Sequence, residues 1–176
     1  EVREILGSRV FAIDEESMED AVGSLLSRFN KTIAVYENLT GGLVTGRMLD
    51  ASHEHVITGI IGNDITAIQR LLAHSSAPER SEELLSDTGE EALTAEIARA
   101  IRLQAGADLG LALHGVQDPD DTALNLGKGR TVITITDGNA FRSRIYESAG
   151  RGIPDRTRMS INAVELVRMA LTEGFG

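Results

Sequence analysis

The sequence predicts a three-layer α/β/α sandwich with a mixed, mostly parallel sheet. Short apolar runs alternate along the chain with segments in which apolar residues recur at helical spacing. Strands that alternate with helices in this way form a parallel sheet covered by helices on both faces. One antiparallel member is expected, because Asp137-Gly138 is a hairpin signal between the last two apolar runs. A chain of 176 residues with 41% hydrophobic residues is long and apolar enough for one domain with its own core.

The first part of the chain predicts a helix followed by two strand–helix units. Residues 1–13 read as a linker or N-terminal extension, and the domain is predicted to span 14–176. Asp14 is expected to cap a helix with Met18 and Phe29 on its apolar face. The strands expected next are 32–36 and 55–61, and the helices are 43–50 and one that Asn63 or Asp64 caps, with Ile65, Ile68, Leu71 and Leu72 on one face.

The second part predicts a helix over 91–104 and three further strands. Residues 75–90 are polar, and one helical turn is expected at 82–85. The strand 108–114 is apolar at nearly every position, which is typical of a strand buried on both faces. A long loop, 115–130, follows it, and loops of this length are usually functional or mobile. The elements expected after the loop are strands 131–136 and 141–147 and a helix that opens at Pro154.

The composition excludes several classes of function. A net charge of −10 without a basic stripe would repel nucleic acid, and aromatic residues, at 3%, are too few for base stacking. The chain has no Cys, which excludes disulfides, thiolate metal sites and Cys catalysis and fits a cytoplasmic protein. No apolar run is long enough to span a membrane, so no membrane partner is expected. The chain begins with Glu1 rather than Met, which fits a fragment or processed product of a longer protein.

The turn after the first expected strand is the most informative segment. Residues 37–42 read Glu-Asn-Leu-Thr-Gly-Gly and stand between an apolar strand and the start of a helix. This arrangement places backbone N–H groups around one point and suits an anion such as a phosphate. Thr40, Gly41 and Gly42 are therefore candidate ligand contacts, although the two glycines would equally permit a tight turn. Glu37 would either bind a ribose hydroxyl or a water in the cleft at the carboxyl ends of the strands, or pair with an Arg or a helix N-terminus.

Several motifs occur in the order found in one known family. Residues 37–42 match Glu-Ser-x-Thr-Gly-Gly except at Asn38, and residues 106–115 match Gly-Ala-Asp-hydrophobic-Gly-hydrophobic-Ala-x-x-Gly. A loop rich in Gly, Pro and Asp follows, residues 129–132 open a strand, and Arg151, Arg156 and Arg158 lie at or before the last helix. Over residues 8–172 the chain resembles the C-terminal domain of the CinA (competence/damage-inducible protein) family, whose stand-alone relatives are nicotinamide mononucleotide amidohydrolases.

The resemblance implies both a fold and an activity. The family's fold is the same three-layer sandwich, and its members hydrolyse the amide of nicotinamide mononucleotide and release ammonia. The resemblance also implies a small nucleotide ligand, a homodimer and fusion behind an N-terminal nucleotide-processing domain.

The residues expected for that chemistry are absent. Amide hydrolysis through an acyl intermediate needs a nucleophile and a nearby base, and the family's Ser falls on Asn38 here. The family's Tyr-Ser-Asn-x-x-Lys motif should follow the second strand, but residues 59–69 contain neither Tyr nor Lys. Gln117 and Asp118 also replace two small residues of a Gly-x-Ala-Gly-Pro loop.

The sequence therefore predicts a divergent member in which deamidase chemistry is lost or weakened. It would bind a nucleotide-like ligand or serve as a regulatory or assembly domain. One alternative is an active amidohydrolase with a rearranged set drawn from Glu37, Thr40 and His114. Another is a purely structural dimerisation domain.

The remaining candidate ligand contacts lie around the same predicted cleft. The amides of Asn38 and Asn63 would hydrogen-bond an amide-containing ligand, although Asn63 also fits a helix cap. His114, beside Gly115, ends a strand where it would share a cleft with Glu37 and where a general base would sit, or it would pack in the core or rim. Arg156 would contact a phosphate. No catalytic residue and no cofactor is assigned. No metal ligand is assigned either, because His53 and His55 have no third ligand at a characteristic spacing.

Overall fold

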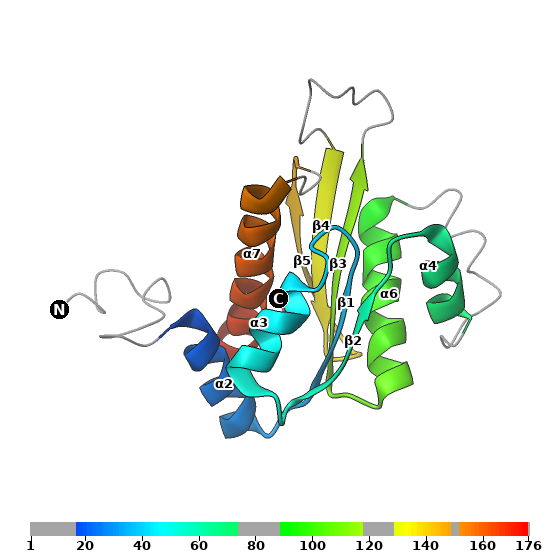
Figure 1. Cartoon of the computed structure of the whole chain (residues 1–176). Coiled ribbons are helices and arrows are strands. Elements are labelled where there is room, and N and C mark those ends of the chain that lie inside the picture. The colour runs from blue at the N-terminus through cyan, green and yellow to red at the C-terminus, as the bar shows by residue number, and fades with distance from the viewer. Residues whose placement is uncertain (1–16, 74–88, 118–128, 149–151, 176) are drawn as a thin grey trace.

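A five-stranded sheet in the order β2-β1-β3-β4-β5 forms the middle of the computed structural model (Figure 1). The structure describes residues 17–73, 89–117, 129–148 and 152–175. Its strands are β1 (Ile33–Glu37), β2 (Val56–Ile61), β3 (Leu109–Gln117), β4 (Gly129–Thr136) and β5 (Phe141–Tyr146). Strands β2, β1 and β3 are parallel, whereas β4 runs antiparallel to both β3 and β5. The predicted mixed, mostly parallel sheet with one antiparallel member is therefore confirmed.

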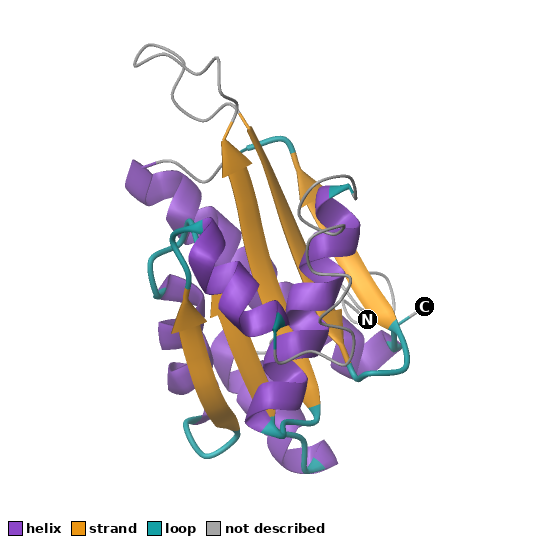
Figure 2. Cartoon of the chain, turned by 90° about the vertical axis from the view of Figure 1, so that its right-hand side faces the viewer, coloured by secondary structure: helices purple, strands orange, loops and turns teal. Residues whose placement is uncertain are grey.

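Helices cover both faces of this sheet. Helices α2 (Met18–Phe29), α3 (Leu43–Ser52) and α7 (Gly152–Glu173) lie on one face, and α4 (Ile65–Leu72) and α6 (Glu90–Ala105) lie on the other (Figure 1). Figure 2, viewed from the side on which α4 and α6 lie, shows the strands behind these helices. The three-layer sandwich predicted from the alternation of strands and helices is confirmed.

The core is divided into two halves by the sheet. Consecutive strand residues point to opposite faces, so Ile33 and Val35 of β1 pack with α2, α3 and α7, while Ala34 and Tyr36 pack with α4 and α6. The same alternation in β3 places Leu113 in the first half of the core and Ala112 in the second. This alternation decides which side chains meet at the carboxyl ends of the strands.

One predicted helix cap was wrong, and for another helix the structure selects one of the two predicted residues. Helix α2 is capped by Ser17, whose hydroxyl accepts from the backbone of Asp20 at 3.1 Å while the Asp20 carboxylate accepts from the Ser17 backbone, a reciprocal capping box. Helix α4 is capped by Asp64 rather than Asn63, and Oδ1 of Asp64 accepts from the backbone of Ala67 at 3.0 Å. Asp14 lies outside the described residues.

The structure also differs from the sequence prediction in the end of one strand and in the burial of one helical residue. Strand β3 continues to Gln117, beyond the predicted end at 114, because it pairs with β4 as far as Gly129. Ile65, predicted to share the apolar face of α4, is 53% exposed, whereas the other three predicted residues are buried. The predicted extension 1–13, the helical turn at 82–85 and the loop residues 118–128 lie outside the described residues.

Candidate functional site

The carboxylate of Glu37 caps the N-terminus of α3. Glu37 ends β1 and is fully buried. Its Oε1 accepts from the backbone N–H of Thr45 at 2.8 Å and from the Thr45 hydroxyl at 2.6 Å. Its Oε2 accepts from the backbone N–H of Val44 at 3.1 Å and from the hydroxyl of Thr40. Of the two predicted roles of Glu37, the structure therefore has the pairing with a helix N-terminus, and the four donors match the acceptor capacity of a carboxylate.

The side chain of Asn38 joins the end of β1 to β3. Its Nδ2 donates to the carbonyl oxygen of Gly115 at 2.9 Å, and its Oδ1 accepts from the Gly115 backbone N–H at 2.9 Å. The same Oδ1 accepts from the backbone of Leu39 at 2.6 Å, and the Asn38 backbone donates to Leu113 at 3.3 Å. The Asn38 side chain thus continues the hydrogen bonding between β1 and β3 beyond Glu37, the last residue of β1.

A pocket of about 390 Å³ opens beside this turn, between β1, β3 and the start of α4. We call it the β2–α4 pocket. Its lining residues are Asn38, Leu39, Gly62, Asn63, Asp64, Ile65, Ile68, His114, Gly115 and Val116. The pocket lies where the turn after β1 meets the segment after β2. The resemblance to the family places its Ser in the first segment and its Tyr and Lys in the second.

His114 is the most deeply buried titratable group in this lining, with 7% of its surface exposed. Its Nδ1 is buried and has no hydrogen-bond partner among the described residues. Burial lowers the pKa of His114 to about 4, because a charged imidazolium would lose its hydration. The imidazole is therefore neutral at physiological pH.

The Tyr36 side chain lies on the same face of the sheet as His114 and contacts Gly62, which lines the pocket. Its hydroxyl donates to the carbonyl oxygen of Gly62 at 3.1 Å. Burial, and then the negative charge of Asp64, raise the pKa of Tyr36 to about 12. A β-carbon on Gly62 would lie 2.6 Å from the Tyr36 ring, so only glycine permits this packing.

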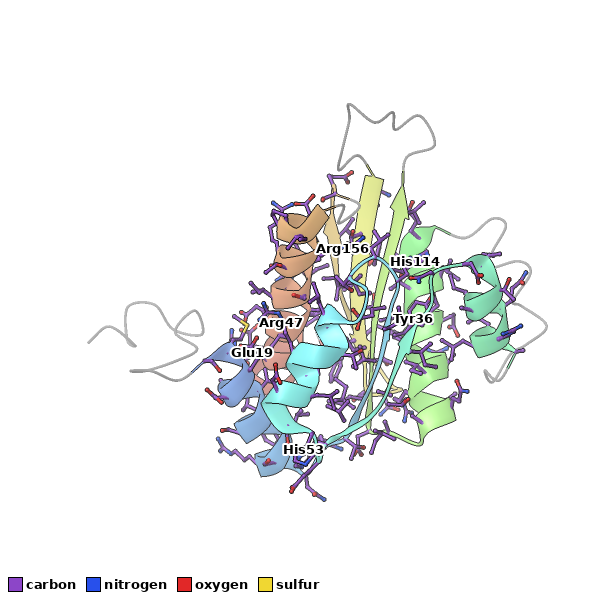
Figure 3. All side chains as sticks on the ribbon, viewed as in Figure 1. Glu19, Tyr36, Arg47, His53, His114 and Arg156 are labelled. Carbon is purple, nitrogen blue, oxygen red and sulfur yellow. The ribbon has the colours of Figure 1, made fainter. Side chains whose placement is uncertain are left out.

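Arg156 reaches the turn after β1 from the opposite face. In Figure 3 it projects from the start of α7, while Tyr36 and His114 lie toward α4 and α6. A β-carbon built on Gly41 would lie 3.9 Å from Nη1 of Arg156. No described residue accepts a hydrogen bond from the backbone N–H groups of Gly41 and Gly42, which both have positive φ, at 64° and 99°. This turn therefore holds two backbone N–H groups without an acceptor among the described residues, and the Arg156 guanidinium lies beside Gly41.

The structure separates two residues that were expected to share a cleft. Glu37 pairs in register with Leu113 of β3, so His114, the next residue, points to the opposite face of the sheet. The expected shared cleft of Glu37 and His114 was therefore wrong. Thr40 is 2% exposed and does not line the pocket. Asn38, Asn63, His114 and Gly115 are brought together around the pocket, whereas Arg156 lies beside Gly41 in the neighbouring turn.

Three residues at the site were not predicted from the sequence in these roles. Thr45 donates to Glu37, and Asp64 and Ile68 line the pocket. For Thr45 the available signal was its position as the third residue of a helix that follows a strand ending in a carboxylate. His53 lies at the other end of the sheet from His114 (Figure 3). Nearby in the chain, Nδ1 of His55 is 2.8 Å from the Ser52 hydroxyl. Among the described residues, no three His, Asp or Glu side chains gather closely enough to hold a metal ion. No helix in the described ranges is long and apolar enough to cross a membrane.

The chain forms a three-layer α/β/α sandwich with the turn of residues 37–42 at the carboxyl ends of its parallel strands. Residues 15–171 match the model of the CinA C-terminal domain. The chain belongs to this family.

Relatives of known sequence agree with that assignment. The chain is 30% identical to a CinA-like protein of Geobacter sulfurreducens, an alignment that covers 97% of this chain and 41% of the relative. It is 29% identical to a putative competence-damage inducible protein of Thermoanaerobacter pseudethanolicus, again over 97% of this chain and 41% of the relative. The chain thus spans about two-fifths of the length of these relatives.

Solved structures share the fold. A CinA superfamily protein from Klebsiella pneumoniae superimposes with a TM-score of 0.72 at 17% identity, covering 89% of this chain and 96% of that one. A competence/damage inducible protein from Agrobacterium tumefaciens superimposes with a TM-score of 0.67 at 18% identity, covering 92% and 97%. At these identities the likeness concerns the fold.

Proposed function

We propose that this domain binds a nucleotide-like ligand at the carboxyl ends of its parallel strands without hydrolysing an amide. The observation that carries the proposal is the Asn38 side chain. It stands where the resemblance places the family's nucleophile, and both its donor and its acceptor are engaged by the backbone of Gly115. A carboxamide is not a useful nucleophile, and this one serves as a structural bridge.

The other groups of a rearranged catalytic set do not meet the geometry of an acyl transfer. Nucleophile and base must lie within hydrogen-bond reach of each other and of the substrate. The Thr40 hydroxyl donates to Glu37, but both residues are buried and neither lines the pocket. His114 lines the pocket, yet no Ser, Thr, Lys or Tyr stands among the described lining residues to share a proton with it. This arrangement supports binding rather than turnover.

The two groups of candidate contacts suit the two ends of a nucleotide. The β2–α4 pocket, of about 390 Å³, suits a ring and its substituent. The first-turn N–H groups of α3 are taken by Glu37. The backbone N–H groups of Gly41 and Gly42, from which no described residue accepts, and the guanidinium of Arg156 beside Gly41 suit a phosphate. Gly41 follows Leu39 of the pocket by two residues, and two residues of chain span at most roughly 7 Å. One mononucleotide is long enough to use both.

Two measurements on the same preparation test the proposal. Isothermal titration calorimetry with nicotinamide mononucleotide should give saturable binding, and a coupled ammonia assay at the same concentrations should give no turnover. An authentic nicotinamide mononucleotide amidohydrolase serves as the positive control for ammonia. Steady ammonia release that disappears in Thr40→Ala would instead support the rearranged enzyme.

The purely structural alternative predicts a different pattern. A domain that serves only for dimerisation would form a dimer by light scattering and show no thermal shift with any mononucleotide. Absence of binding in both the calorimetric and the thermal-shift experiment would therefore overturn the proposed function.

A further inference from the structure

Helices α3 and α7 begin at the same edge of the sheet. Strands β1, β3 and β5 run in one direction, because β4 is antiparallel to both of its neighbours. Helix α3 follows β1 and helix α7 follows β5, so both helices start where these strands end, and they contact each other on one face of the sheet (Figure 1). The turn with Gly41 and Gly42 precedes α3, and Arg156 stands near the start of α7. The position of α7 relative to α3 therefore decides how far Arg156 lies from this turn.

Arg47, a residue of α3, joins the two helices. Its Nε donates to the hydroxyl oxygen of Ser160 in α7 at 2.8 Å. Ser160 is fully buried, and its hydroxyl donates in turn to the carbonyl oxygen of Thr157 at 2.7 Å. A hydroxyl has one proton to donate and lone pairs with which to accept. The two bonds of Ser160 therefore fix the direction of its oxygen and the separation of α3 and α7 at this point.

The other end of the Arg47 guanidinium is paired with α2. Nη1 of Arg47 forms an ion pair with the carboxylate of Glu19, and both side chains are partly buried (Figure 3). The opposite charge of Glu19 weakens the attraction of Arg47 for an anion. Arg156, by contrast, makes no hydrogen bond or ion pair with another described residue. Arg47 thus ties three helices together, whereas Arg156 is the guanidinium left to meet a ligand.

The tie lies close to the place proposed for the phosphate. Ser160 follows Arg156 by four residues of α7, so the two side chains stand one above the other on the same face of that helix. Arg47 follows Gly42 by five residues, which is roughly 7.5 Å along the axis of α3. Between the tie and the turn there is thus little more than one turn of each helix.

We propose that Arg47 is a positioning residue for the phosphate of the ligand. Through Ser160 it holds the first turns of α7 where the Arg156 guanidinium and the backbone N–H groups of Gly41 and Gly42 contact the same phosphate. Arg47 itself does not touch the ligand. Without the tie, α7 must be brought into place when the ligand binds, and this ordering reduces the affinity. This inference rests on the proposed function and assigns a residue that supports it from outside the site.

Ser160→Ala removes the tie without changing any charge. By calorimetry, we expect the affinity for nicotinamide mononucleotide to fall about threefold, because part of the binding free energy then goes into ordering α7. The affinity for nicotinamide riboside, which has no phosphate, should stay as it is in the unmodified protein. Thr172→Ala is the matched control, since the Thr172 hydroxyl also donates within α7, to the Arg168 carbonyl at 2.9 Å, but at the far end of the helix. Thr172→Ala should change neither affinity.

A second variant removes the tie from the side of α3. Arg47→Met keeps a long side chain but neither hydrogen bond, and it should lower the affinity for the mononucleotide as Ser160→Ala does. In a protein that already carries Arg156→Ala there is no guanidinium left to position, so neither variant should lower the affinity further. A general structural defect would instead act equally in both backgrounds and on both ligands. Because Arg47→Met also removes a charge, Ser160→Ala separates the tie from a simple electrostatic attraction.

The outcomes distinguish this inference from the function on which it rests. If the unmodified protein binds the mononucleotide and both variants bind it equally tightly, Arg47 is not a positioning residue and the proposed function stands. A fall of the same size for the riboside, or a further fall in the Arg156→Ala background, would also overturn the assignment. If the unmodified protein binds neither ligand, the proposed function fails and the inference fails with it.

Discussion

The carboxamide of Asn38 and the backbone of Gly115 form a reciprocal pair of hydrogen bonds, each 2.9 Å long, between residues 77 positions apart in the chain. The pair continues the contact of β1 with β3 past the point where the β1 ladder ends at Glu37. It fixes the turn after β1 against the strand that bears His114. Asn38, which stands where the resemblance to the family implies a Ser, therefore links β1 to β3.

Replacing Asn38 with Ser should weaken the fold without creating an enzyme. A Ser side chain is too short to make both bonds, so the polar groups of Gly115 lose their partners, at a cost of about 1–3 kcal/mol in the free energy of unfolding. Urea unfolding measures this loss. Asn63→Ser, at an exposed residue of the same pocket with no side-chain hydrogen bond to a described residue, should change stability by less than about 0.5 kcal/mol. We expect no ammonia release from nicotinamide mononucleotide by Asn38→Ser, because residues 59–69 also lack the Tyr and Lys that the resemblance implies. Ammonia release by this variant would contradict that expectation.

Glu37→Gln should destabilise the protein through α3. The carboxylate accepts from two backbone N–H groups and two hydroxyls, and an amide can supply only one acceptor oxygen to these four donors. We expect a loss of roughly 2–4 kcal/mol in the free energy of unfolding. Glu54→Gln, at an exposed residue just after α3, is the control and should be near neutral. If Glu37→Gln keeps full stability but loses ligand affinity, Glu37 is a ligand contact after all.

Stability should fall in acid partly because of His114. Its pKa is about 4 in the folded protein, against 6.5 for an unperturbed histidine, so the unfolded chain binds the proton first as the pH falls. Between these two values the unfolded state holds more protons, and the free energy of unfolding therefore decreases as the pH decreases. The difference amounts to roughly 3 kcal/mol when complete, below about pH 4.

Unfolding by urea at a series of pH values measures this contribution. His114→Phe cannot bind the proton, so the stability difference between it and the unmodified protein should shift in favour of the variant as the pH falls from 7 to 4. A difference independent of pH would mean that His114 is not buried as a neutral ring.

Two glycines of β3 should differ in their tolerance of alanine. A β-carbon on Gly110 would collide with the carbonyl oxygen of Ala98 in α6, whereas one on Gly115 would collide with the end of the Leu39 side chain. Backbone cannot move aside as a flexible side chain can, so Gly110→Ala should cost several kcal/mol and Gly115→Ala about 1–2 kcal/mol. Thermal unfolding of both variants decides the order. The reverse order would mean that α6 adjusts its position over the sheet.

Much of the fold was predictable because it depends on short-range periodicity. The alternation of apolar runs and amphipathic segments predicted every described strand and helix to within a few residues, and Asp137-Gly138 predicted the antiparallel pair of β4 and β5. The caps were less certain, since Asn63 and Asp64 are equally good capping residues by type. Only the backbone conformation selects Asp64.

The sequence predicted which segments form the candidate site, but not how their side chains are arranged. The motif order brought attention to the turn after β1, yet the pairing of Asn38 with Gly115 joins distant segments and has no local signal. The separation of Glu37 from His114 depends on the register between β1 and β3, in which Glu37 lies opposite Leu113. A shift of one residue would reverse which face each side chain occupies, and nothing in the sequence alone fixes that shift.

Arg156→Ala should weaken binding of a phosphorylated ligand but not of its nucleoside. The guanidinium stands beside Gly41 and makes no hydrogen bond or ion pair with another described residue, so it is free to meet a phosphate. Charge-assisted contacts of this kind at an exposed site contribute moderately, and we expect the affinity for nicotinamide mononucleotide to fall about three- to tenfold. Nicotinamide riboside, which lacks the phosphate, should bind the variant and the unmodified protein equally. Arg158→Ala is the matched control, because Arg158 is also exposed on the first turns of α7 but pairs with Asp155 at 3.0 Å. If Arg156→Ala weakens the riboside as much as the mononucleotide, or if Arg158→Ala has the same effect, the phosphate does not bind at this turn.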